Sequence, residues 1–129
     1  GKLVPLVNKN IDTGMGLERL ACVLQGKASN FEIDLFLPIH EAVLQALKLD
    51  PKKVQARPLY TISDHLRAAV FSIADGVVPS NEGRGYVIRK LIRRAIWQAY
   101  QLIPQQKLAE PFLFKAVPAV IKVMDEAYP

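Results

Sequence analysis

The chain has 129 residues, half of them apolar, and it carries 17 basic against 12 acidic side chains, a formal net charge of +5. This length suits one domain with a single core, and the apolar content excludes a wholly disordered chain. Because its apolar runs are only a few residues long and Cys22 is the sole cysteine, the sequence excludes a bilayer-spanning helix, an internal disulfide and a Cys-x-x-Cys metal site.

The N-terminal region predicts one extended segment and one helix. Leu3–Val7 predicts a short edge strand, because Pro5 lacks the N–H group that a central strand needs. Gly14–Gln25 predicts a helix that begins at a Gly-x-Gly turn and ends at Gly26. The apolar residues expected to point inward from this helix are Leu17, Leu20, Ala21 and Leu24.

Two further helices are predicted before residue 76. Glu32–Leu49 has helical apolar spacing, and Pro38 within it predicts either a kink or a short helix followed by a longer one. Asp50–Pro58 is polar, contains two prolines and predicts the longest loop. Thr61 and Asp64 resemble a capping box that starts a helix ending at Asp75. Its expected inner face is Ile62, Leu66, Ala69, Val70 and Ile73.

The C-terminal half predicts two more helices after a turn-rich loop at Gly76–Gly85. The first ends before Pro104, and the second covers roughly Phe112–Tyr128, with Pro118 as a potential kink. These patterns predict a mainly α fold: a bundle-like domain of about five helices with a short N-terminal strand or extended segment. The chain has no initiator methionine and ends abruptly, so we interpret it as a piece of a longer protein.

Within the stretch Asn81–Tyr100, the segment Arg84–Arg94 holds the whole net charge. It contains five basic residues and, after Gly83, no acid; removing these five from the 17 leaves 12, equal to the number of acids. The five are Arg84, Arg89, Lys90, Arg93 and Arg94. The helical period puts Ile88, Leu91, Ile92, Ala95, Ile96 and Ala99 on the opposite face. Such a localised charge indicates a polyanion as partner. Alternatively, the face is solvated, and its aromatics Tyr86 and Trp97 contact another helix or domain.

Two loops carry residues suited to ligand binding. In Asp12–Arg19, Gly14 and Gly16 allow close approach of a ligand to a helix start, Arg19 suits a phosphate or a flat ring, and Asp12 suits an ammonium group. The alternative is a glycine-rich turn with an exposed arginine.

The loop before the basic helix delivers an amide side chain, Asn81, which can read base edges in the minor groove of an RNA helix. His40 and His65 have no neighbouring ligands at metal spacing, so we interpret both as structural, with His65 hydrogen-bonded in the packing of this loop on its helix. No metal site is predicted.

Asp12–Arg19, together with the loop and basic helix at Asp64–Arg94, resembles the alanyl-tRNA synthetase family of class II aminoacyl-tRNA synthetases. Asp12–Arg19 is similar to that family's third catalytic motif, and Asp75–Arg94 to the start of its helical tRNA-recognition domain. The resemblance implies that residues 1–26 are the tail of a catalytic domain and residues 27–129 part of the tRNA-recognition domain. The parent protein would activate alanine with ATP and transfer it to tRNA(Ala).

The resemblance also implies residue roles. Arg19 would be catalytic, lying against the adenine ring and γ-phosphate of ATP, while Gly14 and Gly16 leave room for the nucleotide and Asp12 holds the amino group of alanine. Asn81 would read the G·U wobble pair of the acceptor stem. The cations that would contact the stem are Arg84, Arg89, Lys90, Arg93 and Arg94. The full-length enzyme would need ATP and Mg²⁺, with neither bound to this piece, and its partners would include neither a membrane nor DNA. The expected location is the cytoplasm.

The earlier class II motifs do not precede Asn10, so the isolated piece is expected to be inactive. Two other functions stay open. The chain could be a basic helical module that binds structured nucleic acid without catalysis, or a structural helical domain that docks on an acidic partner.

Overall fold

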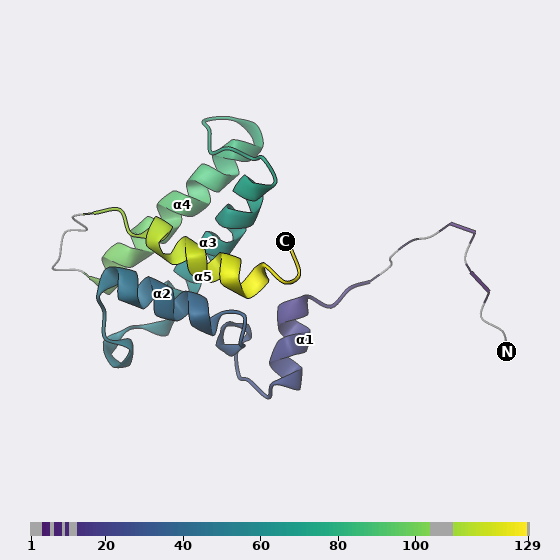
Figure 1. Ribbon diagram of the computed structural model, residues 1–129, viewed down its shortest axis with the longest axis horizontal. Helices are drawn as coiled ribbons and strands as arrows, with labels where there is room; N and C mark the ends of the chain where they lie inside the picture. The colour runs from purple at the N-terminus through teal and green to yellow at the C-terminus, as the bar shows by residue number, and fades with distance from the viewer. Residues whose placement is uncertain (1–3, 6, 9, 11–12, 104–109, 129) are drawn as a thin grey trace. The chain divides into compact units, whose positions relative to one another are not determined.

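The computed structural model describes residues 4–5, 7–8, 10, 13–103 and 110–128. Within these ranges the chain forms five α-helices, two short 3-10 helices and no strand, which confirms the mainly α fold class (Figure 1). Val4, Pro5 and Val7 are not in a strand, whereas Leu3 and Leu6 lie outside the described residues. The helices are α1 (Leu17–Leu24), η1 (Asn30–Glu32), α2 (Leu37–Leu47), η2 (Pro51–Lys53), α3 (Ala56–Ala74), α4 (Gly83–Leu102) and α5 (Leu113–Met124).

The chain divides into two compact units, residues 1–33 and residues 34–129. In the first unit, α1 begins after Gly16, whose carbonyl oxygen accepts hydrogen bonds from the N–H groups of Arg19 (3.0 Å) and Leu20 (3.1 Å). Gly26 adopts φ +60° beyond the end of α1, and the Lys27 N–H donates to the Cys22 carbonyl oxygen at 2.9 Å. Gly26 therefore terminates the helix as the sequence predicted.

The apolar face of α1 is exposed, so the prediction that it points inward is wrong for this structure. Leu17, Leu20 and Leu24 are all exposed, and only Ala21 is half-buried. A helix buries an apolar stripe only against a second layer. The described part of the first unit contains one α-helix and one 3-10 turn, and these do not supply that layer.

The structure decides between the two alternatives raised by Pro38. A 3-10 turn, η1, is capped by the Ser29 hydroxyl, which accepts from the Phe31 N–H at 3.3 Å. The longer helix α2 then begins at Leu37, with Pro38 in its first turn. A proline there removes no intrahelical hydrogen bond, so a short helix is followed by a longer one without a kink.

Helix α3 begins earlier than predicted. It starts at Ala56, with Pro58 in its first turn, so the predicted loop Asp50–Pro58 is shortened and also contains η2. Thr61 lies inside α3, where its hydroxyl donates to the Arg57 carbonyl oxygen at 3.1 Å. The capping box of Thr61 and Asp64 is therefore wrong, because the hydroxyl is satisfied one turn back along the same helix.

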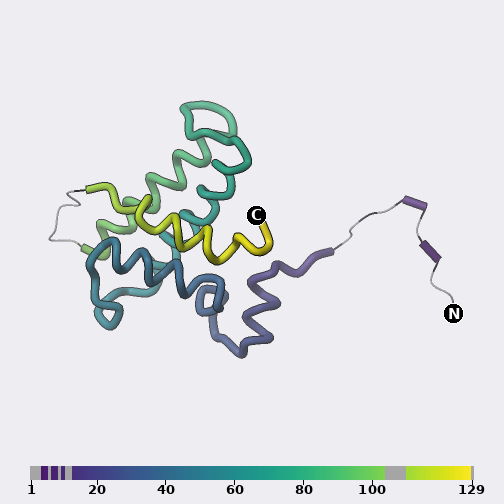
Figure 2. Tube along the Cα trace, viewed as in Figure 1, coloured from purple at the N-terminus to yellow at the C-terminus, as the bar shows by residue number. Residues whose placement is uncertain are grey.

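The second unit is built around α3 and α4, which lie side by side and are joined by the loop at residues 75–82 (Figure 2). Their contact is the most extensive between any two elements, and α2 packs on α5. Ala95 and Ala99 of α4 are fully buried, and such small residues allow close approach of helices. The other core residues are Ile39, Val43, Leu44, Leu47, Leu59, Ile62, Leu66, Phe112, Ala116 and Val120.

Several predicted inner-face residues are only partly buried. Leu91, Ile92 and Ile96 of α4 are half-buried, as is Val70 of α3, while Ile73 is 45% exposed near the end of α3. Helix α5 contains Pro118 and ends at Met124, four residues before the predicted end at Tyr128. The inward faces of α3 and α4 were therefore identified correctly, but their edges and ends are less buried than the helical period implied.

His40 is a core residue. Its ring is stacked against those of Phe36 and Tyr60, and its Nδ1 atom lies 2.7 Å from the buried Ser63 hydroxyl. This confirms the structural interpretation of His40, since burying a polar ring requires such a partner.

Replacing Gly76 by alanine is expected to lower the free energy of unfolding by about 1–2 kcal/mol. Gly76 has φ +85° just after α3, where the Val77 N–H donates to the Ser72 carbonyl oxygen at 2.9 Å. An L side chain is strained in this conformation, and asparagine less so than alanine. Urea denaturation should therefore rank wild type above Gly76→Asn and Gly76→Asn above Gly76→Ala; an unchanged midpoint for the alanine variant would contradict the assignment.

Candidate nucleic-acid interface

The loop between α3 and α4 is stabilised by hydrogen bonds of the Ser80 hydroxyl group, which lies within the loop. The Ser80 Oγ donates to the Glu82 carbonyl oxygen at 2.8 Å and accepts from the Glu82 N–H at 3.4 Å. Gly83 follows with φ +56° and opens α4. Asn81 lies between the two braced residues, and its side chain is exposed.

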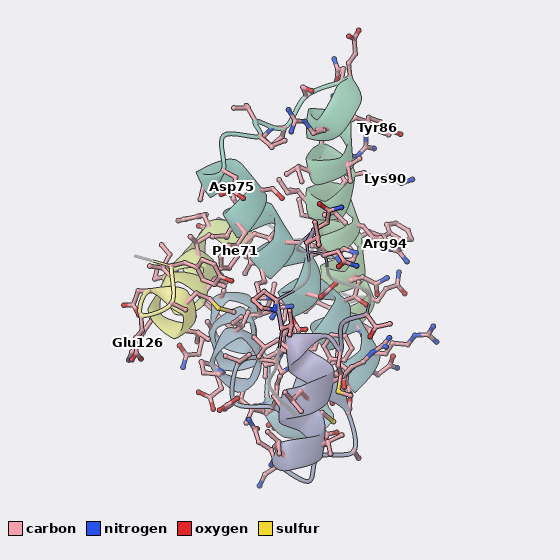
Figure 3. The ribbon with its side chains drawn as sticks, turned by 90° about the vertical axis from the view of Figure 1, so that its right-hand side faces the viewer. Phe71, Asp75, Tyr86, Lys90, Arg94 and Glu126 are labelled. Atoms are coloured by element: carbon pink, nitrogen blue, oxygen red, sulfur yellow. The ribbon has the colours of Figure 1, made fainter. Side chains whose placement is uncertain are left out.

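Four cations line one face of α4, which we call the basic face: Arg89, Lys90, Arg93 and Arg94. All four are exposed. Figure 3 shows Lys90 and Arg94, with Tyr86, along the side of α4 turned away from α3. Tyr86 is 51% exposed and Trp97 is 62% exposed. The helix thus packs through its alanines and presents cations and two aromatic rings outward.

Asn81 lies beside the basic face. A surface depression of about 300 Å³ is lined by Asn81, Tyr86, Arg89, Lys90 and Arg93. One loop amide, one aromatic ring and three cations therefore border a single hollow. Amide groups can donate and accept hydrogen bonds with base edges, while guanidinium groups match phosphate oxygens.

Arg84 does not join this cluster. It is exposed in the first turn of α4, and nine residues at 100° each put it roughly 180° from Arg93 around the helix. Arg94 is on the basic face but does not line the depression. The predicted cations thus form three sets. Arg89, Lys90 and Arg93 line the depression, Arg94 lies outside it on the basic face, and Arg84 lies on another side of α4.

The basic face is not neutralised by the described residues. Within ranges 13–103 and 110–128, no side chain of the basic face forms an ion pair or a hydrogen bond with another described residue, and the same holds for Asn81. Clustered cations of this kind create a positive potential that attracts anions.

The glycine-rich motif belongs to the first unit. Gly14, Gly16 and Arg19 are all exposed, whereas Asp12 lies outside the described residues. A Cβ atom at Gly14 would meet nothing within 4 Å, and one at Gly16 would meet only the Glu18 carboxylate at 3.7 Å. The internal packing of the unit therefore does not require either glycine. In the described part of the chain no three His, Cys, Asp or Glu side chains form a metal-binding group, so we assign no Mg²⁺ ligand.

His65 lies in the helical interior. Its side chain is 13% exposed and borders an apolar cavity of about 190 Å³ whose walls come from α3, α4 and α5. The Nδ1 atom is 3.4 Å from the Asp64 carboxylate, yet neither ring nitrogen makes a hydrogen bond to a described residue. The predicted hydrogen bond of His65 in the loop–helix packing is therefore wrong, since the ring lies among apolar side chains.

The family described as "tRNA synthetases class II (A)" matches residues 1–129. The chain belongs to this class II synthetase family. It is 52% identical over 132 residues to the alanine–tRNA ligase of Ligilactobacillus salivarius and 48% identical over 131 residues to that of Fervidobacterium nodosum. Each alignment includes the whole chain, which spans only 14% and 15% of the two relatives. The chain is thus a fragment relative to these synthetases. In the ranges that the structure describes, no helix has the length and apolar character to cross a membrane.

Proposed function

We propose that the parent protein is an alanine–tRNA ligase and that this stretch recognises the acceptor stem of tRNA(Ala). The observation that carries the proposal is the depression in which Asn81 meets Tyr86, Arg89, Lys90 and Arg93. The similarity to alanine–tRNA ligases over the whole chain supports the same conclusion.

The arrangement divides recognition between two kinds of contact. The guanidinium groups of Arg93 and Arg94 hold the RNA backbone through phosphate oxygens, which supplies affinity without reading sequence. The Asn81 amide lies against the shallow minor groove, where its oxygen accepts from the 2-amino group of guanine. In a G·U wobble pair this amino group has no partner on uracil, so the amide distinguishes wobble from Watson–Crick geometry. Tyr86 covers the adjacent sugar.

The first unit contributes part of the ATP and alanine site. Arg19 lies against the adenine ring and γ-phosphate, Gly14 and Gly16 admit the nucleotide, and Asp12 holds the alanine ammonium group. The alanine carboxylate attacks the α-phosphorus and releases pyrophosphate, which leaves alanyl-adenylate. A ribose hydroxyl of the tRNA then attacks the carbonyl carbon of this adenylate, forms the alanyl ester and releases AMP. Arginine offsets the negative charge that develops during these steps.

In this proposal, residues 1–26 form the tail of the catalytic domain and residues 27–129 part of the tRNA-recognition domain. The partners of the whole enzyme are tRNA(Ala), ATP and alanine. A cytoplasmic location belongs to the same proposal, and a single cysteine, Cys22, is compatible with a reducing compartment.

The proposal is tested by binding the chain to acceptor-stem minihelices that differ only in one base pair, G·U or G·C, at two salt concentrations. Tighter binding of the wobble helix at both concentrations, with overall affinity that falls as salt rises, is the expected result. Salt-sensitive binding without preference would instead favour a generic nucleic-acid-binding module. If the chain bound neither minihelix, both acceptor-stem recognition and the generic nucleic-acid-binding module would be contradicted.

Replacing Arg93 by alanine is expected to weaken binding to both minihelices equally and to reduce the salt slope, d log K/d log[salt], by about one unit, because one phosphate contact is lost. Lys122→Ala is the matched control, since it removes the same charge from an exposed position on α5. It should leave the slope unchanged. Equal slopes for the two variants would show that net charge, and not the basic face, governs binding.

A further inference from the structure

We propose that Gly85, together with Ser80, is a positioning residue for Asn81. The missing side chain at residue 85 lets the loop lie directly on the first turn of α4, and this contact holds the amide at the rim of the depression. The inference rests on the proposed function, because it assigns the residue that aims the proposed base reader.

Gly85 is required for space. It is buried in the first turn of α4, and its φ is not among the positive values found at Gly26, Gly76 and Gly83. A Cβ atom at residue 85 would collide with the Val78 carbonyl oxygen and the Ser80 Oγ, and it would lie 2.9 Å from the Ser80 nitrogen. Two of these three atoms belong to the backbone, so rotating a side chain cannot relieve the collision.

The Ser80 Oγ, the one side-chain atom among the three, is also held in position. The Ser80 hydroxyl bonds to both main-chain groups of Glu82, at 2.8 Å and 3.4 Å, and these bonds would be lost if it turned away. Asn81 lies between Ser80 and Glu82, so its backbone is constrained on both sides. The Gly85 contact thus fixes the segment that carries the amide.

A side chain at residue 85 would displace the loop rather than α4. Val78, Ser80 and Asn81 are exposed, whereas Gly85 and Ile88 are buried on α4, whose contact with α3 is the most extensive in the unit. A methyl group at residue 85 therefore displaces the loop and Asn81 with it, while the basic face stays in place. The consequence is a loss of base discrimination without a loss of phosphate binding.

Gly85→Ala is expected to reduce the preference for the G·U minihelix over the G·C minihelix by at least about fivefold, the lower limit for a good base contact. Affinity for the G·C helix and the salt slope should match wild type. Val87→Ala, an exposed substitution in the same turn of α4, should change neither quantity. Equal weakening of both helices by Gly85→Ala would overturn the proposal.

A double-mutant cycle with Asn81→Ala separates this inference from the proposed function. If Gly85 acts through Asn81, Gly85→Ala has no further effect on the preference once Asn81 is alanine. If wild type and Asn81→Ala had the same preference for the G·U minihelix over the G·C minihelix, the proposed function would be rejected. A preference lost in Asn81→Ala but retained in Gly85→Ala would reject only the role of Gly85.

Far-UV circular dichroism and thermal unfolding check that the variants are folded. If Gly85→Ala does not fold, Ser80→Ala provides the test, because it removes the hydroxyl brace without adding volume. It should lose part of the wobble preference at unchanged salt slope. Full retention of the preference in Ser80→Ala would then overturn the proposal.

Discussion

Replacing Asn81 by alanine is expected to remove about 1–3 kcal/mol of discrimination between acceptor stems with a G·U and a G·C pair. The Asn81 amide lines the depression and can accept a hydrogen bond from a base edge while the cations beside it contact phosphates. Its loss should therefore leave binding to the G·C helix and the salt slope as they are in wild type. Binding isotherms for both minihelices at two salt concentrations measure the three quantities together.

Gln101→Ala is the matched control for this substitution. Gln101 also has an exposed amide side chain, but it lies at the far end of α4, roughly 27 Å of helix rise from the loop that carries Asn81. It should keep the full wobble preference. The assignment of Asn81 would be rejected if Asn81→Ala weakened both RNAs equally, as expected for Arg93→Ala, or if Gln101→Ala lost the preference as well.

Replacing Phe36 by alanine is expected to lower the free energy of unfolding by about 3–5 kcal/mol, the largest stability effect that we predict. The ring is only 1% exposed and is stacked on His40 at 5.8 Å between centroids. The Arg67 guanidinium lies 4.5 Å from the centre of the same ring. Truncation therefore creates a cavity and also removes a cation–π contact.

Phe114→Ala is the control, because that ring is 63% exposed on α5. It should change stability by only about 0.5 kcal/mol. Urea denaturation, followed by far-UV circular dichroism and by the fluorescence of Trp97, measures both variants on the same unit. Similar losses for the two phenylalanines would contradict the burial that distinguishes them.

The helices were predictable where their apolar period was long and their ends carried glycine. Gly26 ends α1 and Gly76 follows α3, each in the left-handed conformation that favours glycine. The start of α3 was not predictable in the same way. Pro58 and the polar residues around it suggested a loop, although proline is compatible with a first helical turn and Thr61 is compatible with a helix interior.

The candidate interface was predictable in its residue types and only partly in its geometry. Helical spacing grouped Arg89, Lys90, Arg93 and Arg94 on one face, and these residues are exposed together. The same spacing, at roughly 100° per residue, puts Arg84 on another side of α4 from Arg93. Helical spacing did not reveal the contact of Gly85 with the loop, although a Gly-x-Gly at residues 83–85 was a visible signal of close backbone approach.

The order of residues alone determined the helical class, the segregation of charge onto one helix and the family, because periodicity and local motifs are properties of neighbouring residues. Tertiary structure decided which apolar faces are covered, leaving Leu17 and Leu20 exposed while Ala95 and Ala99 are buried. It also decided that Asn81 borders the same hollow as Arg93. The physical reason is that burial and side-chain contacts depend on a second element packing against the first, and the local sequence pattern does not specify which element that is.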